Sequence, residues 1–443
     1  MNIKTMILLT ATAAGLTLTS CKTEKEATPF KWQVDQFADV RIMRYQIPEF
    51  DSLTPNQKVL VYYLSEAAKC GRDIIWDQNY KYNLTVRSVL ESIYNGYNGD
   101  RNNANWEQFM VYLKRVWFSN GIHHHYSNDK FIPEFTQEYF AELVKNTPAE
   151  KFNTTLGSTD EIITNLTPIL FDPNVATKRV NQDAGVDMVA ASACNYYEGV
   201  TQKEVEDFYA KMMNPKDTTP ISYGLNSKLV KENGKVIEKV WKIDGMYGAA
   251  IAKIVYWLEK AATVAENEHQ RNIINTLIEY YKSGDLKKFD EYNVLWVSDV
   301  NSHIDFVNGF IENYGDPMGY KSSWEAVVNF KNLEATRRTT IIGDNAQWFE
   351  DNSPIDEQFK KKEVKGVSAK VITVAQLGGD CYPTTPIGIN LPNADWIRKY
   401  HGSKSVTMDN ITYAYDQAAQ GNGFMEEFAW SPEIGRASCR ERV

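Results

Sequence analysis

A helical repeat of apolar residues constrains the fold of this chain more than any other feature. Residues 247–261 read YGAAIAKIVYWLEKA, in which Ile251, Ile254, Val255 and Leu258 occupy positions i, i+3, i+4 and i+7. This spacing places all four side chains on one face of an α-helix, and that face must be buried against another element. Similar patterns predict further helices at residues 104–117, 136–146, 202–212 and 266–282, and after the Thr54-Pro55 pair.

A smaller β portion is expected from segments that lie far apart in the sequence. The stretch KLVKENGKVIEKVW predicts a hairpin, because Asn233-Gly234 suits a tight turn between two alternating strands. Between about residues 366 and 412 the pattern changes to short strands and turns. The 443 residues are enough for two or three domains or lobes. We therefore predict an α+β fold in which helices dominate.

Composition limits the partners of the chain. A net charge of −9 argues against a nucleic-acid partner, because phosphate binding needs a basic surface. The chain has 25 Tyr and 11 Trp, and aromatic side chains suit ligand grooves as well as packed cores. A surface protein that binds glycans on such aromatic platforms is therefore an alternative function.

The N-terminal residues resemble the leader of a bacterial lipoprotein. A lysine is followed by a short apolar stretch and by Leu18-Thr19-Ser20-Cys21, which resembles a lipobox. The apolar stretch is too short to span a membrane. We expect residues 1–21 to be a signal peptide, Cys21 to carry the lipid and residues 22–35 to form a tether. The expected location is the bacterial cell envelope, in the periplasm or at the outer membrane.

Three adjacent histidines, His123, His124 and His125, are the most prominent local signal. A catalytic zinc needs three converging ligands, whereas adjacent residues on an extended chain point apart. We expect a loop in which one imidazole lines a cleft and the others form hydrogen bonds. A protein that binds a metal through these histidines stays open as an alternative. The five cysteines have no metal-site spacing, and buried free thiols are expected.

The stretch FVNGFIENYGDP, residues 306–317, is a candidate binding strand. A strand through these residues would place Glu312 and Tyr314 on one face, about 7 Å apart. A carboxylate and a phenol at this separation suit the binding of an ammonium group and the polarisation of a carbonyl group. A half-buried strand with polar residues in solvent would show the same pattern.

The stretch PIGINLPN, residues 386–393, is a candidate edge strand. Its two prolines, Pro386 and Pro392, cannot donate to a ladder, so the strand is expected at the edge of a sheet. An edge can accept a peptide as an added strand, and Gly388 would allow a close backbone approach. Asn390 and Asn393 could hydrogen-bond a peptide terminus. An ordinary turn-rich connector would also fit these residues.

The two stretches together, GFIENYGDP with SSWEAVVN and then PIGINLPN, resemble the dipeptidyl peptidase III family of zinc exopeptidases. The similarity runs from about residue 36 to 432 and includes LSEAAKCGRDIIWDQ and HHHYSNDKFIPEF. It implies a two-lobed fold, with a small β-barrel in a mixed lower lobe and a mainly helical upper lobe. The implied activity is the release of dipeptides from the free N-termini of oligopeptides.

The resemblance also implies roles for individual residues. Glu312, Asn390 and Asn393 match the positions that hold the free N-terminus of the substrate. Tyr314 matches the tyrosine that stabilises the scissile carbonyl, and Glu325 matches a further carboxylate of the cleft. The edge whose backbone pairs with the bound peptide corresponds to Pro386, Gly388 and Ile389.

The family's zinc-binding HExxGH and EExxA segments have no match in this chain, so no metal ligand is assigned here. The tail IGRASCRERV, residues 434–443, resembles a translated sequencing adapter. We expect a fragment that lacks most of the upper lobe and its zinc and is itself inactive. The expected divisions are a lower lobe over 36–332, an excursion into the upper lobe over 333–371, lower-lobe β segments over 372–417 and the start of the upper lobe over 418–433.

Overall fold

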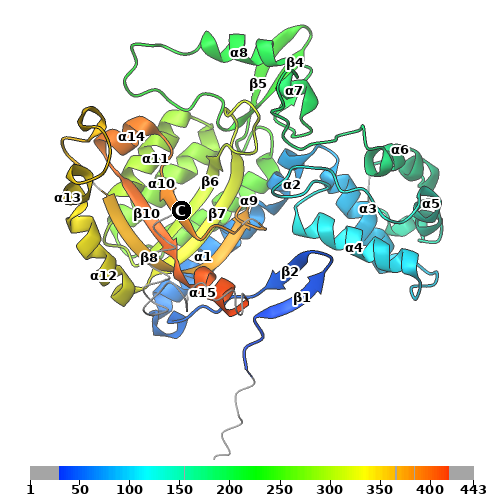
Figure 1. Ribbon diagram of the computed structural model, residues 1–443, viewed down its shortest axis with the longest axis horizontal. Helices are drawn as coiled ribbons and strands as arrows, with labels where there is room; N and C mark the ends of the chain where they lie inside the picture. The colour runs from blue at the N-terminus through cyan, green and yellow to red at the C-terminus, as the bar shows by residue number, and fades with distance from the viewer. Residues whose placement is uncertain (1–28, 154, 365–366, 384, 419–443) are drawn as a thin grey trace, which may run out of the picture.

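The computed structural model describes residues 29–153, 155–364, 367–383 and 385–418. A large body is built round a sheet, with a group of helices on one side and a smaller group of strands and helices above it (Figure 1). Each of these three parts has its own cluster of buried apolar side chains. The chain is thus helix-dominated α+β, as the sequence predicts.

The central sheet has five strands in the order β6-β7-β8-β10-β9. Its strands are β6 (Ile304–Glu312), β7 (Ser323–Lys331), β8 (Val367–Gly379), β10 (Ser403–Met408) and β9 (Gly388–Leu391). The first three are antiparallel, β10 runs parallel to β8, and β9 runs antiparallel to β10. The PIGINLPN stretch therefore contains an edge strand, as predicted.

The sheet is rolled rather than flat. Asp305 on β6 and Lys404 on β10 form a salt bridge of 2.8 Å, although two strands lie between them in the sheet. In a flat sheet three strand spacings would separate them by about 14 Å. The Asp305 carboxylate also accepts a hydrogen bond from the Trp296 indole, and Lys404 lies over that ring. The expected small barrel is thus seen as a rolled sheet.

Five helices pack around this sheet (Figure 1). They are α1 (Pro55–Cys70), α2 (Arg72–Asn79), α9 (Gly248–Ala262), α10 (Glu268–Ser283) and α11 (Leu286–Ser298). Helix α1 contacts α9 and strands β7 and β8, and it begins with the predicted Thr54 cap. The four apolar residues that predicted α9 are all buried.

The helical group beside the sheet comprises α3 (Asn83–Gly96), α4 (Ala104–Phe118), α5 (Gln137–Lys145), η2 (Ala149–Lys151) and α6 (Thr159–Phe171). The smaller group contains α7 (Met188–Ala191), β3 (Tyr197–Glu198), α8 (Gln202–Ala210), β4 (Ser227–Glu232) and β5 (Lys235–Val240). Strands β4 and β5 form the predicted hairpin. Both of its turn residues, Asn233 and Gly234, have positive φ, which explains the choice of Asn-Gly.

The remaining elements lie at the margins. They are β1 (Gln33–Phe37), β2 (Val40–Met43), η1 (Phe50–Ser52), α12 (Leu333–Asp344), α13 (Ala346–Asp351), η3 (Glu357–Phe359), α14 (Asp395–Tyr400) and α15 (Asp409–Ala418). Strand β1 begins inside the expected tether. Helices α12 and α13 bury no residue and expose Ile341 and Trp348.

Several other sequence predictions concern residues or properties that the helices and strands above do not cover. The expected signal peptide with Cys21, the stretch 419–433 and the tail 434–443 lie outside the described residues. The division of the chain into lobes stays a prediction. Two of the three described cysteines, Cys194 and Cys381, are buried free thiols as expected. No helix in the described ranges is long and apolar enough to cross a membrane.

Replacing Lys404 with methionine should destabilise the chain, because it leaves the buried Asp305 carboxylate without its nearest cation. Breaking a buried ion pair from one side costs about 3 kcal/mol or more. Urea unfolding should show this loss for Lys404→Met. The matched control is Lys203→Met, which removes an exposed ion pair with Asp207 and should leave the unfolding free energy unchanged. Equal effects of the two substitutions would contradict a sheet held in its rolled form by this pair.

Candidate functional site

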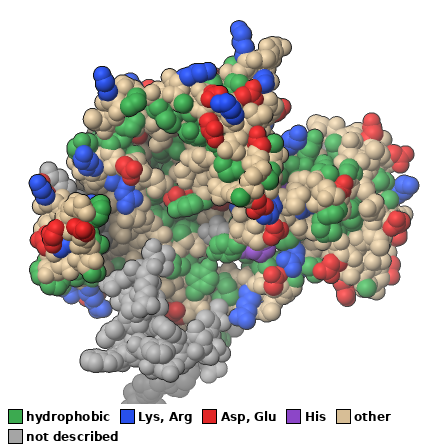
Figure 2. Space-filling model, turned by 45° about the horizontal axis from the view of Figure 1, so that its top comes forward, with side chains coloured by type: hydrophobic (Ala, Val, Ile, Leu, Met, Phe, Trp, Pro, Cys, Tyr) green, Lys and Arg blue, Asp and Glu red, His purple; other side chains and the backbone are tan. Residues whose placement is uncertain are grey.

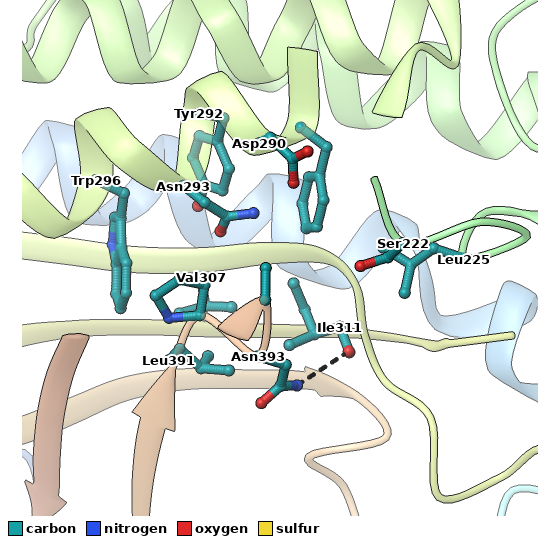
Figure 3. A pocket seen from close by; sticks show the side chains of 13 residues that line it. Ser222, Leu225, Asp290, Tyr292, Asn293, Trp296, Val307, Ile311, Leu391 and Asn393 are labelled. Carbon is teal, nitrogen blue, oxygen red and sulfur yellow. Dashed lines mark hydrogen bonds between the residues drawn. The ribbon is translucent and has the colours of Figure 1, made fainter. Parts of the chain in front are cut away.

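The roll of the sheet brings its two edge strands together. Glu312 is the last residue of β6, and Asn393 follows β9 by two residues. The Asn393 amide donates hydrogen bonds to a Glu312 carboxylate oxygen at 3.0 Å and to the Ile311 carbonyl at 3.3 Å. Figure 3 shows the second of these bonds from a neighbouring pocket. Two residues that the sequence places 81 positions apart are thus in direct contact.

Strand β9 lies beside this contact, with its outer edge unpaired among the described strands. Asn390 is exposed, whereas Pro386, Gly388 and Ile389 are partly buried. Gly388 has a role within the sheet, and its expected role toward a bound peptide stays a prediction. A Cβ there would lie 2.9 Å from the Val406 carbonyl of β10, so this glycine permits the close approach of the neighbouring strand.

Glu325 lies near Glu312 and is buried. Burial raises the pKa of Glu325 well above its usual value, and the charge of Glu312 raises it further. The neutral, protonated form of this carboxyl group is therefore favoured relative to that of a free glutamate. The thiol of Cys381, which is also buried, is its hydrogen-bond partner. Glu325 therefore does not face solvent, and the charge of Glu312 acts on it.

A third carboxyl group, Asp380, completes the acidic part of the site, and sequence reasoning missed it. It directly follows β8, and its amide donates to the Trp324 carbonyl at 3.0 Å beside Glu325. Burial raises the pKa of Asp380, whereas Arg179 and a hydrogen bond from Ser323 lower it. No local pattern marks Asp380, because only the pairing of β7 with β8 brings it here.

The pKa of Glu312 is raised, first by burial and then by the charge of Asp380, while the Asn393 hydrogen bond opposes the shift. A partly buried carboxylate with an amide donor on one side can bind an ammonium group on its open side. Binding a cation would relieve the repulsion between these acidic groups. The arrangement therefore suits recognition of a small cationic group at the end of β9.

Tyr314 does not lie where the strand pattern predicted. Strand β6 ends at Glu312, and the Tyr314 side chain is 84% exposed in the following turn. The turn is organised by Asp316, whose carboxylate accepts hydrogen bonds from the amides of Tyr320 and Lys321. The expected shared strand face for Glu312 and Tyr314 is therefore wrong. Tyr314 follows Glu312 by two residues and is an exposed phenol on a loop.

The three adjacent histidines do not converge. The buried His123 bonds the Ala176 carbonyl through its Nε2, and the His124 Nδ1 accepts from the amides of Tyr126 and Ser127. The ring of His125 stacks on His124. Burial lowers the pKa of His123 to about 4. Within the part of the chain that the structure describes, no group of three or more His, Cys, Asp or Glu side chains is placed to hold a metal ion.

A zinc ion is the metal that the sequence resemblance implies, and the described residues do not fit it. The carboxyl cluster lacks a nitrogen or sulfur ligand that points into it, apart from the Cys381 thiol. That thiol has a raised pKa because it is buried beside Glu325 and Asp380, whereas zinc binds the thiolate. Among the described residues, the candidate site therefore has the chemistry of a binding surface rather than that of a zinc centre.

Comparison with known proteins identifies relatives of this arrangement. A model of peptidase family M49 matches residues 186–430, which is more than half of the chain. Dipeptidyl peptidase 3 of Dictyostelium discoideum is 24% identical over 396 residues, covering 82% of this chain and 54% of that protein. The human dipeptidyl peptidase 3 is 22% identical over 413 residues, covering 85% of this chain and 55% of that protein. The chain thus spans about half the length of these relatives.

Solved structures share the fold. The DPP III structure from Caldithrix abyssi superposes with a TM-score of 0.59 at 19% identity, over 84% of this chain and 58% of that chain. The dipeptidyl-peptidase III of Corallococcus sp. strain EGB gives a TM-score of 0.58 at 18% identity, over 83% of this chain and 56% of that chain. At these identities the likeness shows the two-lobed dipeptidyl peptidase III-like fold and does not transfer individual roles.

The electrostatics of the site predict two opposite shifts in the pKa of Glu312. Asp380→Asn should lower it, because a neighbouring negative charge is removed. Asn393→Leu should raise it, because the ionised form loses a hydrogen-bond donor. Both pKa shifts can be measured by a ¹³C NMR titration of the carboxyl groups. The Glu312 signal is identified by its absence from the spectrum of the Glu312→Gln variant. The exposed Glu259→Gln serves as the control without effect. Shifts of the same sign in the two variants would contradict the geometry described.

Proposed function

Because this chain belongs to peptidase family M49, we propose that the complete protein is a zinc-dependent dipeptidyl peptidase. It releases dipeptides from the free N-termini of oligopeptides. The observation that carries this proposal is the contact between Glu312 and Asn393 at the end of an unpaired edge strand. This contact offers a carboxylate and an amide where a bound peptide would begin.

The first step is recognition of the N-terminal ammonium group. Removing an ammonium from water is costly unless charged and polar partners replace its hydration. Glu312 supplies the charge, while the Asn390 side chain and the Asn393 carbonyl oxygen supply neutral acceptors. This set favours a single positive charge and disfavours an acylated N-terminus.

The direction of the bound peptide follows from the position of this ammonium site. The site lies at the C-terminal end of β9, so a peptide whose N-terminus sits there must run antiparallel to β9. It then passes Ile389, Gly388 and Pro386 in turn and pairs with the backbone at the edge of the sheet. Backbone pairing tolerates many side chains, which gives a broad choice of peptides.

The length of the released fragment follows from strand geometry. Two extended residues span about 7 Å, so the second peptide carbonyl lies a fixed distance from Glu312. We assign Tyr314 to the stabilisation of this carbonyl when the cleft is closed. Its exposed loop position allows that movement, and loops of this kind often complete a site only after closure.

The proposed role of zinc is supported by the family resemblance alone. When bound, the metal would supply an activated water and polarise the scissile carbonyl. The sequence contains no HExxGH segment, and we assign no zinc ligand among the described residues. We therefore expect this 443-residue chain to bind oligopeptides without cleaving them.

We also propose a location for the complete protein. The lipobox-like sequence at Cys21 supports attachment to a membrane by lipid, on the envelope side of a bacterial cell. Peptides in that compartment would reach the edge strand directly.

Incubation of the complete protein with an unblocked hexapeptide should yield dipeptides in order from the N-terminus, as measured by mass spectrometry. Glu312→Gln should raise KM by about 30-fold or more, because the partly buried charge partner of the ammonium is lost. Tyr314→Phe should instead lower kcat by about 100-fold, the usual effect of losing one carbonyl-stabilising donor.

Glu259→Gln, which changes an exposed carboxylate far from β9, should leave both constants unchanged. Release of single amino acids, or cleavage that begins inside the peptide, would contradict the proposed function. An unchanged KM for Glu312→Gln would contradict the assigned ammonium site.

A further inference from the structure

The turn that carries Tyr314 is fixed on both sides of that residue. The side-chain amide of Asn313 donates a hydrogen bond to the Gly319 carbonyl at 2.8 Å. Gly315 packs closely on the sheet, because a Cβ at this position would lie 2.9 Å from the Ser323 Oγ. The backbone next to Tyr314 is thus held in place, although the Tyr314 side chain is 84% exposed.

Asp316 is the centre of this turn and is 3% exposed. Its carboxylate accepts hydrogen bonds from the backbone amides of Met318 at 3.1 Å, Tyr320 at 2.8 Å and Lys321 at 2.7 Å. A fourth hydrogen bond comes from the hydroxyl group of Tyr197 at 2.7 Å. Four donors that converge on one buried carboxylate favour a single arrangement of the turn.

The hydroxyl of Tyr197 ties the turn to the smaller group of elements, because Tyr197 lies on β3. A second attachment to the same group is made by Lys321, which is fully buried. Its ammonium donates to the Ser227 hydroxyl on β4 at 2.9 Å and to the Tyr209 hydroxyl on α8. The Tyr209 ring also stacks on the Tyr320 ring, with 4.4 Å between the centroids. Two strands and a helix of the smaller group therefore hold this turn.

The outer surface of the smaller group faces solvent. Figure 2 shows basic and acidic side chains on it, and the ion pairs Lys203–Asp207 and Lys239–Glu232 are exposed. None of the residues that we assign to peptide binding lies in this group. Its contribution to the candidate site is thus made by its inward contacts with the turn.

We propose that Tyr197 is a positioning residue, which acts through Asp316 to fix the turn that carries Tyr314. This inference rests on the proposed peptidase function and assigns a task to the smaller group. Because the backbone of the turn is held, the movement of Tyr314 on closure is confined to its side chain. Its phenol then reaches the carbonyl of one particular peptide bond. Fixing it matters, since a misplacement of about 1 Å can cost about 100-fold in rate.

The ammonium-binding part of the site does not depend on this turn. Glu312 is held by the pairing of β6 with β7, opposite Ser323, and by the Asn393 amide at 3.0 Å. Loosening the turn should therefore leave the binding of the peptide N-terminus intact. The expected effect is on kcat, without a change in KM.

Kinetics of the complete protein with an unblocked hexapeptide test the proposal. Tyr197→Phe removes one oxygen atom and its hydrogen bond to Asp316. It should lower kcat by about 10-fold or more and leave KM unchanged. The matched control is Tyr247→Phe, which removes a hydrogen bond of 2.6 Å to the Asp77 carboxylate away from the turn. This control should leave both constants unchanged.

A double substitution separates positioning from a general loss of structure. In the Tyr314→Phe variant the hydroxyl that Tyr197 positions is absent, so adding Tyr197→Phe should cause no further fall in kcat. A further fall as large as that in the unsubstituted protein would overturn the proposal. Equal losses of kcat in Tyr197→Phe and Tyr247→Phe would also overturn it. Asp316→Asn, which weakens the same hydrogen bonds, replaces Tyr197→Phe if that variant does not fold.

Hydrogen exchange in the 443-residue chain measures the hold on the turn without any activity. Tyr197→Phe should speed exchange of the Tyr320 and Lys321 amides by about 10-fold, the effect of losing one hydrogen bond to a charged acceptor. Unchanged exchange would overturn the proposal. If the complete protein released no dipeptides, the proposed function would fail and this inference with it. Release with an unchanged kcat in Tyr197→Phe would refute this inference alone.

Discussion

The salt bridge between Asp305 and Lys404 is the interaction on which the rest of the structure depends. It joins β6 to β10 across the inside of the sheet, and Trp296 on α11 seals it by contacting both partners. A second lysine, Lys370 on β8, lies 3.8 Å from the same carboxylate. These contacts require the sheet to roll. Because the sheet rolls, its outer strands β6 and β9 approach each other, and Glu312 meets Asn393. The position of the site is thus a consequence of a buried ion pair that takes no part in it.

The chemistry of the site follows from the same closure. Pairing of β6, β7 and β8 stacks the carboxyl groups of Glu312, Glu325 and Asp380 at one end of the sheet. Burial raises the pKa of each, and the charges of neighbouring carboxylates add to the shift for Glu312 and Glu325. A cation that arrives at the open side of Glu312 lowers the energy of the whole cluster. When that cation is the N-terminal ammonium of a peptide, the peptide backbone can pair with the unpaired edge of β9.

Sequence reasoning predicted the local elements well and the long-range contacts poorly. The apolar repeat predicted α9, and the Asn233-Gly234 pair predicted the turn between β4 and β5, since both depend on neighbouring residues only. The two prolines correctly predicted an edge strand. The dipeptidyl peptidase III resemblance anticipated the family and the fold. The glycan-binding alternative gained no support from the relatives found.

The failures of prediction have physical reasons. The alternation of residues typical of a strand continues in the sequence through Tyr314, so the strand is expected to include it. In the structure the Asp316 carboxylate caps a turn there instead. Gly315 and Pro317 are the residues in the sequence that could have indicated this turn. Asp305 and Lys404 lie 99 positions apart, so nothing local reveals their pairing. Asp380 is a single carboxylate whose role arises only from burial and strand pairing. Residues whose function depends on packing between distant segments therefore need the structure.

The central claim is that this chain binds the free N-terminus of a peptide at Glu312 and Asn393. The most direct test compares two oligopeptides of the same sequence, one with a free N-terminus and one N-acetylated, each labelled at its C-terminus. Fluorescence anisotropy with the 443-residue chain gives both dissociation constants. The account predicts at least about 30-fold weaker binding of the acetylated peptide, since it lacks the charge that Glu312 balances. Equal affinities for the two peptides, or no binding of the free one, would contradict it.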